Sequence, residues 1–142
     1  MAITKILYRN GGLRQAIDYI TNPVKTAENL LTDYVRCDPG YAAQQMMDTK
    51  RALGKTAGRQ CYHIIQSFKP DEITPELAHE IARQFAAAHL PGYEAVIATH
   101  VDKAHIHSHI VFNSVNAVTG KMYHSTRENY YKQIRGVSDR LC

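Results

Sequence analysis

The sequence T-H-V-D-K-A-H-I-H-S-H-I-V-F-N-S-V, at residues 99–115, carries the strongest pattern in the chain. Its second half alternates, with His105, His107 and His109 on one parity and mostly apolar side chains on the other. Alternation that involves β-branched and aromatic residues is typical of a β-strand, in which residues two apart point to the same face. The pattern therefore predicts a strand with one imidazole face and one face packed on a core.

A second strand is predicted directly upstream, over residues 93–99. The polar link 101–104 can turn the chain back as a hairpin, which brings His100 within cross-strand reach of the histidine row. Three neutral imidazoles that converge from adjacent strands are typical of a metal site whose open positions can bind a substrate oxygen. An idle, solvated hairpin is the competing interpretation, and four histidines between residues 100 and 109 disfavour it.

The composition is that of a single globular domain. A chain of 142 residues with 44% hydrophobic and 21% charged residues can bury a proper core. The net charge of +4 is compatible with a polyanionic partner but is not diagnostic of one. Three distant cysteines without C-x-x-C argue against a disulfide scaffold or a zinc ribbon, and no apolar stretch approaches the roughly 18 residues of a membrane span. We expect a cytoplasmic protein without membrane insertion.

Hydrophobic periodicity predicts strands that alternate with helices. The strands are expected over 2–9, 31–37, 60–68, 93–99 and 105–114, with a short return strand near 121–124, and the helices over 13–21, 42–53, 74–89 and 127–141. Because the hairpin is antiparallel and its strands are apolar on one parity only, we predict an α+β fold. The expected form is a two-layer sandwich: an antiparallel five-stranded sheet of the ferredoxin or palm-like kind, with helices on one face and the metal site on the other.

Several helical side chains have predicted positions. The apolar stripe of the first helix consists of Leu13, Ala16, Ile17 and Ile20, and Tyr19 lies away from its centre. Met46, Met47 and Leu53 are expected on or near the buried side of the second helix. Thr74 is expected to cap the third helix, with Pro75 at its first position. His63 is expected to be packed, whereas His79 and His89 are expected at the surface.

Three stretches resemble the motifs of one known family. H-x-D-x-x-H-x-H-x-H followed by I-V-F-N, at 100–113, resembles the metal motif of conjugative relaxases, mobilisation nucleases of the MOBP type in the His-hydrophobic-His endonuclease superfamily. A-I-D-Y-I-T-N-P at 16–23 resembles the family's N-terminal tyrosine motif, and H-I-I-Q-S-F-K-P-D-E-I-T-P-E at 63–76 resembles its central serine motif. The motifs follow in the family's order and spacing, and the resemblance extends over nearly the whole chain.

The resemblance implies a metal-dependent enzyme that nicks and rejoins one DNA strand at an origin of transfer. The intermediate would be a 5′-phosphotyrosyl ester, and the reaction would start conjugative transfer or mobilisation. The implied cofactor is one divalent ion, magnesium or manganese, with zinc as a third candidate. The implied partners are single-stranded or hairpin origin-of-transfer DNA, accessory relaxosome proteins and a coupling protein. Residues 1–142 would form the nicking domain, which we expect to be the N-terminal part of a longer protein.

The resemblance also implies roles for individual residues. Tyr19 would be the nucleophile. Asp102 would be a carboxylate that either orients the metal ligands or activates the nucleophile. The metal ligands would be His100, His107 and His109. Ser67 would contact DNA near the scissile phosphate, and further DNA contacts are expected from Lys25, Arg59 and Asn113.

The chain departs from the family pattern within the histidine row. Ser108, and not a hydrophobic residue, separates His107 from His109, whereas Ile106 gives a literal H-I-H at 105–107. His105 is therefore a substitute candidate for one ligand. A loop that reaches from 101 to 106 would place His100 opposite His107, and a tighter turn would favour His105.

Two other functions compete with the relaxase interpretation. A rolling-circle replication initiator of the same superfamily would carry its nucleophile after the histidines, at Tyr130 or Tyr131. A non-catalytic DNA-binding module would use the histidines to hold a structural metal, which would be closed by four ligands.

Overall fold

The computed structural model describes residues 3–22, 31–69, 72–101 and 105–124. Five strands form one sheet in the order β1-β3-β5-β4-β2, and all paired neighbours are antiparallel. The strands are β1 (Ile3–Arg9), β2 (Thr32–Val35), β3 (Cys61–Phe68), β4 (Ala95–His100) and β5 (Ile106–Asn113). The helices are α1 (Leu13–Ile20), α2 (Ala42–Leu53) and α3 (Pro75–His89). The predicted α+β class and the five-stranded antiparallel sheet are confirmed.

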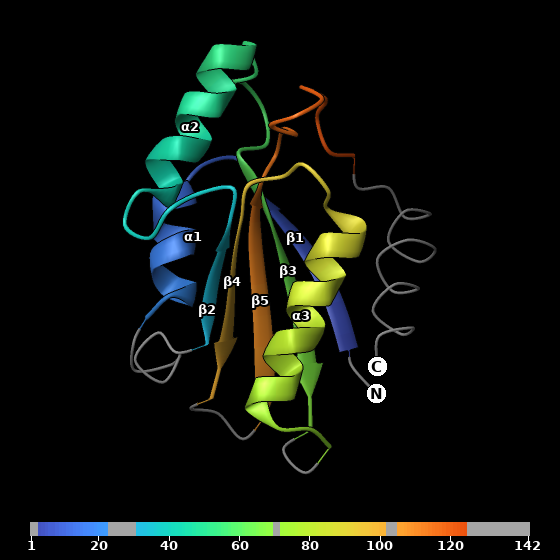
Figure 1. Ribbon diagram of the computed structural model, residues 1–142. Coiled ribbons are helices and arrows are strands. Elements are labelled where there is room, and N and C mark those ends of the chain that lie inside the picture. The colour runs from blue at the N-terminus through green and yellow to red at the C-terminus, as the bar shows by residue number, and fades with distance from the viewer. Residues whose placement is uncertain (1–2, 23–30, 70–71, 102–104, 125–142) are drawn as a thin grey trace.

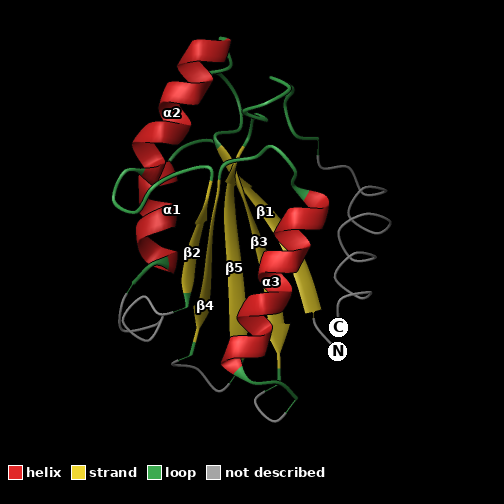
Figure 2. Ribbon diagram, in the orientation of Figure 1, coloured by secondary structure: helices red, strands yellow, loops and turns green. Residues whose placement is uncertain are grey.

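The helices lie on both faces of this sheet, which corrects the prediction that they share one face. α3 packs in front of the sheet in Figure 1, on a core that includes Ile97 and Ile110. α1 and α2 pack on a second core that includes Val96 and Val111. Neighbouring residues of a strand point to opposite faces, so the two cores lie on opposite sides of β4 and β5. Figure 2 shows α1 and α2 on one side of the strands and α3 on the other. The face of β5 that carries His107 and His109 continues with the apolar Val111. α1 and α2 pack on this face at Val111.

The position of α1 follows from its apolar stripe. Its four predicted stripe residues are all buried, and Ile20 is fully inaccessible. Burial of an isoleucine side chain contributes about 1.5–3 kcal/mol, so the stripe holds α1 firmly on β4 and β5. Tyr19 points away from the stripe and remains 51% exposed. The helix therefore presents a phenol at its edge while its other side is anchored.

The buried side of α2 differs in part from the prediction. Met46 is fully buried, but Met47 and Leu53 are each 39% exposed. The side that packs carries Ala42 and Met46 and continues to Lys50, at successive spacings of four residues. Lys50 is almost fully buried, and its ammonium donates to the backbone carbonyl of Gln60, the residue directly before β3. Hydrophobicity alone favoured the methionine pair and missed the lysine.

α3 begins as predicted. The side-chain oxygen of Thr74 accepts a hydrogen bond of 3.2 Å from the amide of Leu77, and Pro75 occupies the first helical position. This cap satisfies one of the amide groups that a helix start leaves without an intrahelical partner.

A buried polar chain connects α3 to the histidine hairpin. His79, which was expected at the surface, is only 6% exposed. Its Nε2 lies 2.6 Å from Asp33 Oδ2 and its Nδ1 lies 2.9 Å from Thr99 Oγ1. Thr99 Oγ1 in turn lies 2.9 Å from Ser108 Oγ. The expectation was wrong because the partners of His79 come from β2 and β4, far away in the sequence.

The last described residues form an irregular segment with a single bridge between Val115 and Met122, where a short return strand was expected. The predicted helix over 127–141 lies outside the described residues. Within the described ranges, no helix has the length and apolar character needed to cross a membrane.

Candidate functional site

The histidine hairpin is formed by β4 and β5 at the lower end of the sheet in Figure 1. His100 is the direct partner of His107, and Ala98 is the partner of His109. His100 and His109 are therefore diagonal neighbours on one face, and their ring centres are 4.0 Å apart. The rings of His107 and His109 are separated by 6.2 Å. The hairpin thus brings together the three histidines that the resemblance implied as ligands.

His105 lies at the outer end of this row. Its ring is parallel to that of His107, with 6.3 Å between the two centres, and it is exposed. His100 and His109 are buried, at 2% and 4% exposure, and His107 is half-buried. The pairing of His100 with His107 corresponds to the longer of the two connections considered from the sequence.

Tyr19 reaches the same cluster from α1. Its ring meets those of His100 and His109 edge-on, with centre-to-centre distances of 5.7 and 6.1 Å. The helix is also tied to the hairpin, because Nε2 of His100 lies 3.0 Å from the carbonyl oxygen of Ile20. An exposed phenol and a buried imidazole cluster therefore lie side by side, although 80 residues separate them in the sequence.

A fourth histidine, His63, contacts the cluster on the same face of the sheet. It lies on β3, the strand that pairs with β5 on the side away from β4. Its Nε2 lies 2.7 Å from Nδ1 of His109, and both side chains are buried. Burial, with smaller contributions from Arg9 and His100, lowers the pKa of His63 from 6.5 to about 4. The expectation that His63 is packed is confirmed, but its contact with His109 was not foreseen. The sequence did show that His63 and Ser67 share one face of the predicted strand, which was the available signal that His63 lies near the site.

Ser67 lies beside the cluster as well. It is the direct partner of His107 across β3 and β5, and it is half-buried. The tyrosine, serine and histidine motifs therefore contribute to one surface, formed by α1 and by the adjoining ends of β3, β4 and β5.

Two predicted DNA contacts lie elsewhere. Asn113, at the far end of β5 from His107, is fully buried, and its amide donates to the Met46 carbonyl and to Glu94 at 3.0 and 2.9 Å. We therefore withdraw Asn113 as a DNA contact, because its side chain is used inside the protein. Arg59 lies over the Tyr8 ring at 3.8 Å, before β3 begins, and is not part of the histidine cluster. Asp102 and Lys25 lie outside the described residues.

The three imidazoles of the cluster are donor groups that suit a divalent ion. Their rings, as oriented in the structure, do not yet surround a common point. Two imidazoles that share an ion through bonds of about 2 Å have ring centres roughly 5 Å apart. The distances of 4.0 and 6.2 Å lie on either side of this value. Within the described ranges, however, no group of three His, Cys, Asp or Glu side chains is arranged to hold a metal. Nε2 of His100 faces a carbonyl, so this ring would bind an ion through Nδ1 or after turning.

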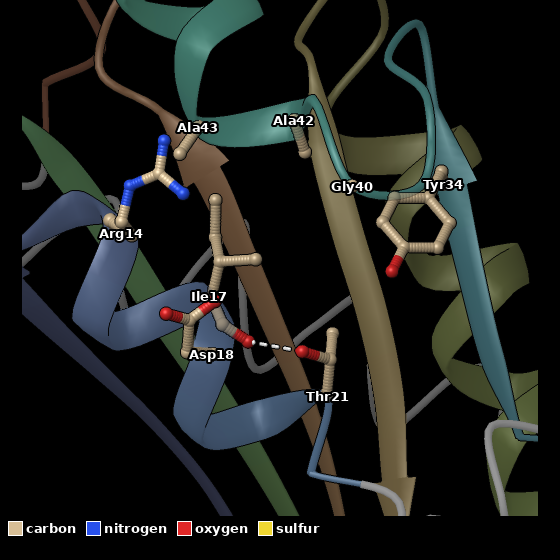
Figure 3. Close-up of a pocket in the computed structure, with 8 residues that line it drawn as sticks. All are labelled: Arg14, Ile17, Asp18, Thr21, Tyr34, Gly40, Ala42 and Ala43. Atoms are coloured by element: carbon tan, nitrogen blue, oxygen red, sulfur yellow. Dashed lines mark hydrogen bonds between the residues drawn. The ribbon is translucent and has the colours of Figure 1, made fainter.

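The cavity in Figure 3 lies between α1, β2 and the start of α2. Its volume is about 100 Å³, and a neighbouring recess of about 440 Å³ shares Thr21, Tyr34 and Gly40 with it. Its walls combine apolar side chains with the charged groups of Arg14 and Asp18. Tyr19 and the clustered histidines do not line it, so the candidate reaction centre is the open sheet surface and not this cavity.

Comparison with known proteins points to one family. A family model described as "Relaxase: MobA/VirD2-like, nuclease domain" matches residues 19–142. The protein rlx of Staphylococcus aureus is 37% identical over 142 residues, which are all of this chain and 42% of rlx. The group II intron-interrupted relaxase LtrB of Lactococcus lactis subsp. cremoris is 58% identical over an alignment that covers 78% of this chain and 24% of LtrB. The chain thus spans less than half the length of these relatives.

A solved structure described as "Molecular Basis of Vancomycin Resistance Transfer in Staphylococcus aureus" has the same fold. It superposes with a TM-score of 0.61 over 99% of this chain and 91% of that chain. The sequence identity is 11%, so the similarity concerns the fold alone.

Proposed function

Because the chain belongs to the MobA/VirD2-like relaxase family through its nuclease domain, we propose that it nicks and rejoins single-stranded DNA through a tyrosine at an origin of transfer. The observation that carries this proposal is the contact of the exposed Tyr19 ring with His100 and His109. Tyr19 is exposed enough to reach a DNA strand, and it lies on the same surface as the cluster of imidazole donors. A strand-transfer reaction requires both on one surface.

In the proposed reaction the phenolic oxygen of Tyr19 attacks the scissile phosphorus. The bond from phosphorus to O3′ breaks, O3′ takes up a proton, and the 5′ phosphate remains esterified to the tyrosine. Because one phosphate ester replaces another, the energy of the bond is conserved. Rejoining reverses the step: a 3′-hydroxyl attacks the phosphotyrosine and the phenol leaves. The phenol proton needs an acceptor, and Asp102 is the residue we propose for it.

His100, His107 and His109 would hold the divalent ion of the proposed reaction, for which magnesium, manganese and zinc are the candidates. When bound, such an ion would polarise the non-bridging phosphate oxygens and offset charge in the in-line transition state. The hydroxyl of Ser67, across from His107, can donate to a phosphate oxygen. α1 holds the phenol against the cluster through its buried stripe and the contact between Ile20 and His100.

The competing functions receive less support. The relaxase family model and the contacts of Tyr19 with two of the clustered rings both favour Tyr19 as the nucleophile. Tyr130 and Tyr131 of the replication-initiator interpretation lie outside the described residues. A structural metal does not require an exposed tyrosine at its edge. Origin-of-transfer DNA, accessory relaxosome proteins and a coupling protein remain the proposed partners, and the cytoplasm the proposed location.

A covalent-adduct assay tests the proposal. The chain is incubated with Mn²⁺ and labelled single-stranded DNA tiled from the element that encodes it, and adducts are detected on denaturing gels and mapped to a peptide. We expect an adduct on Tyr19 that Tyr19→Phe abolishes. Tyr8→Phe is the matched control, since Tyr8 is 52% exposed, like Tyr19, but lies outside the cluster. An adduct that disappears only in Tyr130→Phe or Tyr131→Phe would identify a replication initiator instead. The absence of any adduct would contradict the enzymatic proposal.

A further inference from the structure

We propose that His63 is a positioning residue that fixes the tautomer of His109, so that Nε2 of His109 carries the lone pair needed to bind a metal ion. This inference deepens the proposed function and rests on it for its biological meaning. The geometry on which it stands, a hydrogen bond between two buried imidazoles, belongs to the protein without metal.

The sheet register creates this contact. His63 on β3 is the partner of Val111 on β5, and Ile65 is the partner of His109. His63 and His109 are therefore diagonal neighbours on the face that carries the cluster, at the range where only longer side chains meet. Their rings are 4.9 Å apart between centres, and Nε2 of His63 lies 2.7 Å from Nδ1 of His109.

Because both rings are buried, the hydrogen bond between them decides which nitrogen of His109 carries the hydrogen. His63 is 5% exposed and His109 is 4% exposed, so water cannot readily replace either partner. Two neutral ring nitrogens at hydrogen-bond distance share one proton, and each imidazole carries its hydrogen on only one nitrogen. If Nδ1 of His109 donates, its Nε2 keeps the lone pair. If Nε2 of His63 donates, the hydrogen of His109 sits on Nε2, which then cannot bind a metal. The choice of donor thus decides whether His109 is a competent ligand.

The first arrangement agrees with how metal-binding histidines are usually held. Such histidines donate their other ring N–H to a carboxylate, a carbonyl or a water, which fixes the tautomer and the ring orientation. At His109 the acceptor is another imidazole. His100 and His107 lie beside His109 along the hairpin, so an ion held by all three would lie on the side of His109 that faces them. His63 contacts His109 from the neighbouring strand β3, as a supporting residue would.

This assignment gives β3 two contributions to one surface. His63 and Ser67 are four residues apart on one face of the strand, and each contacts or pairs with a residue of the histidine row. Ser67 lies opposite His107, and His63 supports His109. The central motif would therefore supply a phosphate contact and also the residue that prepares a ligand.

The tautomer is measured directly by long-range ¹H–¹⁵N correlation NMR of the imidazoles in metal-free protein. We expect the hydrogen of His109 on Nδ1 in the wild type. His63→Leu removes the acceptor and should shift His109 towards the Nε2–H form, whereas His63→Gln places an amide oxygen near the same position and should restore the Nδ1–H form. A wild-type His109 with its hydrogen on Nε2 would overturn the inference.

Metal affinity provides the second measurement. Titration calorimetry with Mn²⁺ and absorption spectra with Co²⁺ should show that His63→Leu weakens binding by roughly 10–100-fold, as expected for a residue that orients a ligand. His63→Gln should recover most of this affinity. His89→Leu is the matched control, because His89 is a partly buried histidine that bonds to Tyr123 and lies outside the cluster. Circular dichroism establishes that each variant is folded.

The outcomes separate this inference from the proposed function. If the wild type forms the Tyr19 adduct and folded His63→Leu binds Mn²⁺ as tightly as the wild type, the positioning role is wrong and the nuclease proposal stands. If the wild type forms no adduct, the nuclease proposal is wrong, and the tautomer measurement still decides the role of His63.

Discussion

Nε2 of His100 lies 3.0 Å from the carbonyl oxygen of Ile20, the residue that follows Tyr19. Because a carbonyl can only accept, the ring nitrogen donates in this bond. The contact connects the end of α1 with the end of β4, and it fixes the distance between the proposed nucleophile and the proposed ligands. The histidine thus contributes to the position of the helix before any ion is considered.

Substitution of His100 should therefore destabilise even the metal-free protein. We expect His100→Ala to lower the free energy of unfolding by about 1–3 kcal/mol, because it leaves a buried carbonyl without its donor and opens a cavity. His107→Ala is the matched comparison and should cost less, since His107 is half-buried. Urea denaturation in the presence of a chelator measures both. Equal losses would show that the bond to Ile20 contributes nothing to stability.

The two outer histidines should differ in their effect on nicking. We expect His107→Ala to lower the rate of adduct formation by roughly 100-fold or more, as for the loss of a group that stabilises the transition state. His105→Ala should change the rate only a few-fold, because His105 is exposed at the far end of the row. Single-turnover adduct formation with saturating Mn²⁺ makes the comparison. The reverse order would assign the third ligand to His105.

Ser67 and Asn113 should separate function from stability. Ser67→Ala should slow adduct formation by roughly tenfold or more through the loss of a hydrogen bond to a charged phosphate, with little change in unfolding free energy. Asn113→Ala should cost about 2 kcal/mol, since it breaks buried bonds to Met46 and Glu94. Its nicking rate per folded molecule should remain that of the wild type. A lower DNA affinity in folded Asn113→Ala would restore the DNA contact that we withdrew.

The buried chain behind the hairpin should contribute to stability. His79→Ala removes the partner of Asp33 and of Thr99, and we expect a loss of about 2–3 kcal/mol in unfolding free energy. Arg83 also contacts Asp33, at 3.5 Å, but both groups are substantially exposed, so Arg83→Ala should cost at most about 0.5 kcal/mol. Guanidinium denaturation of both variants tests the contrast. A small loss in His79→Ala would show that water can replace the imidazole.

His89 should make stability depend on pH. Burial lowers the pKa of His89 in the folded protein. As the pH falls below the ordinary pKa of histidine, the unfolded chain therefore binds a proton more readily than the folded protein does. Stability should therefore decrease as the pH falls from 7 towards 5. His89→Gln should lose less stability over this interval than the wild type does, in parallel denaturation curves. Identical pH slopes for the two proteins would contradict the role of His89.

The local elements could be predicted from the sequence because their signals are local. The stripe of α1 and the cap at Thr74 depend on neighbours three or four residues away. The hairpin of β4 and β5 was predictable for the same reason, and with it the approach of His100 to His107.

The remaining features depend on contacts between distant segments. Nothing near His79 indicates that Asp33 and Thr99 will surround it. The sequence around His63 shows that His63 shares a strand face with Ser67, but it does not show that residue 109 will be its neighbour. The second helical layer was missed for a similar reason. One face of β5 changes from imidazole to Val111 along its length, and alternation alone does not show where a helix will cover it.

The place of β5 in the strand order has a consequence for motion. It is the third of five strands and is bonded on both sides, so the backbone of His107 and His109 belongs to the part of the sheet that should exchange its amide hydrogens most slowly. Tyr19 sits on a helix of only eight residues, which packs on β4 and β5. We therefore expect that, once the phenol carries DNA, the displacement needed to release one end and admit another occurs in the helix, while the imidazoles keep their place.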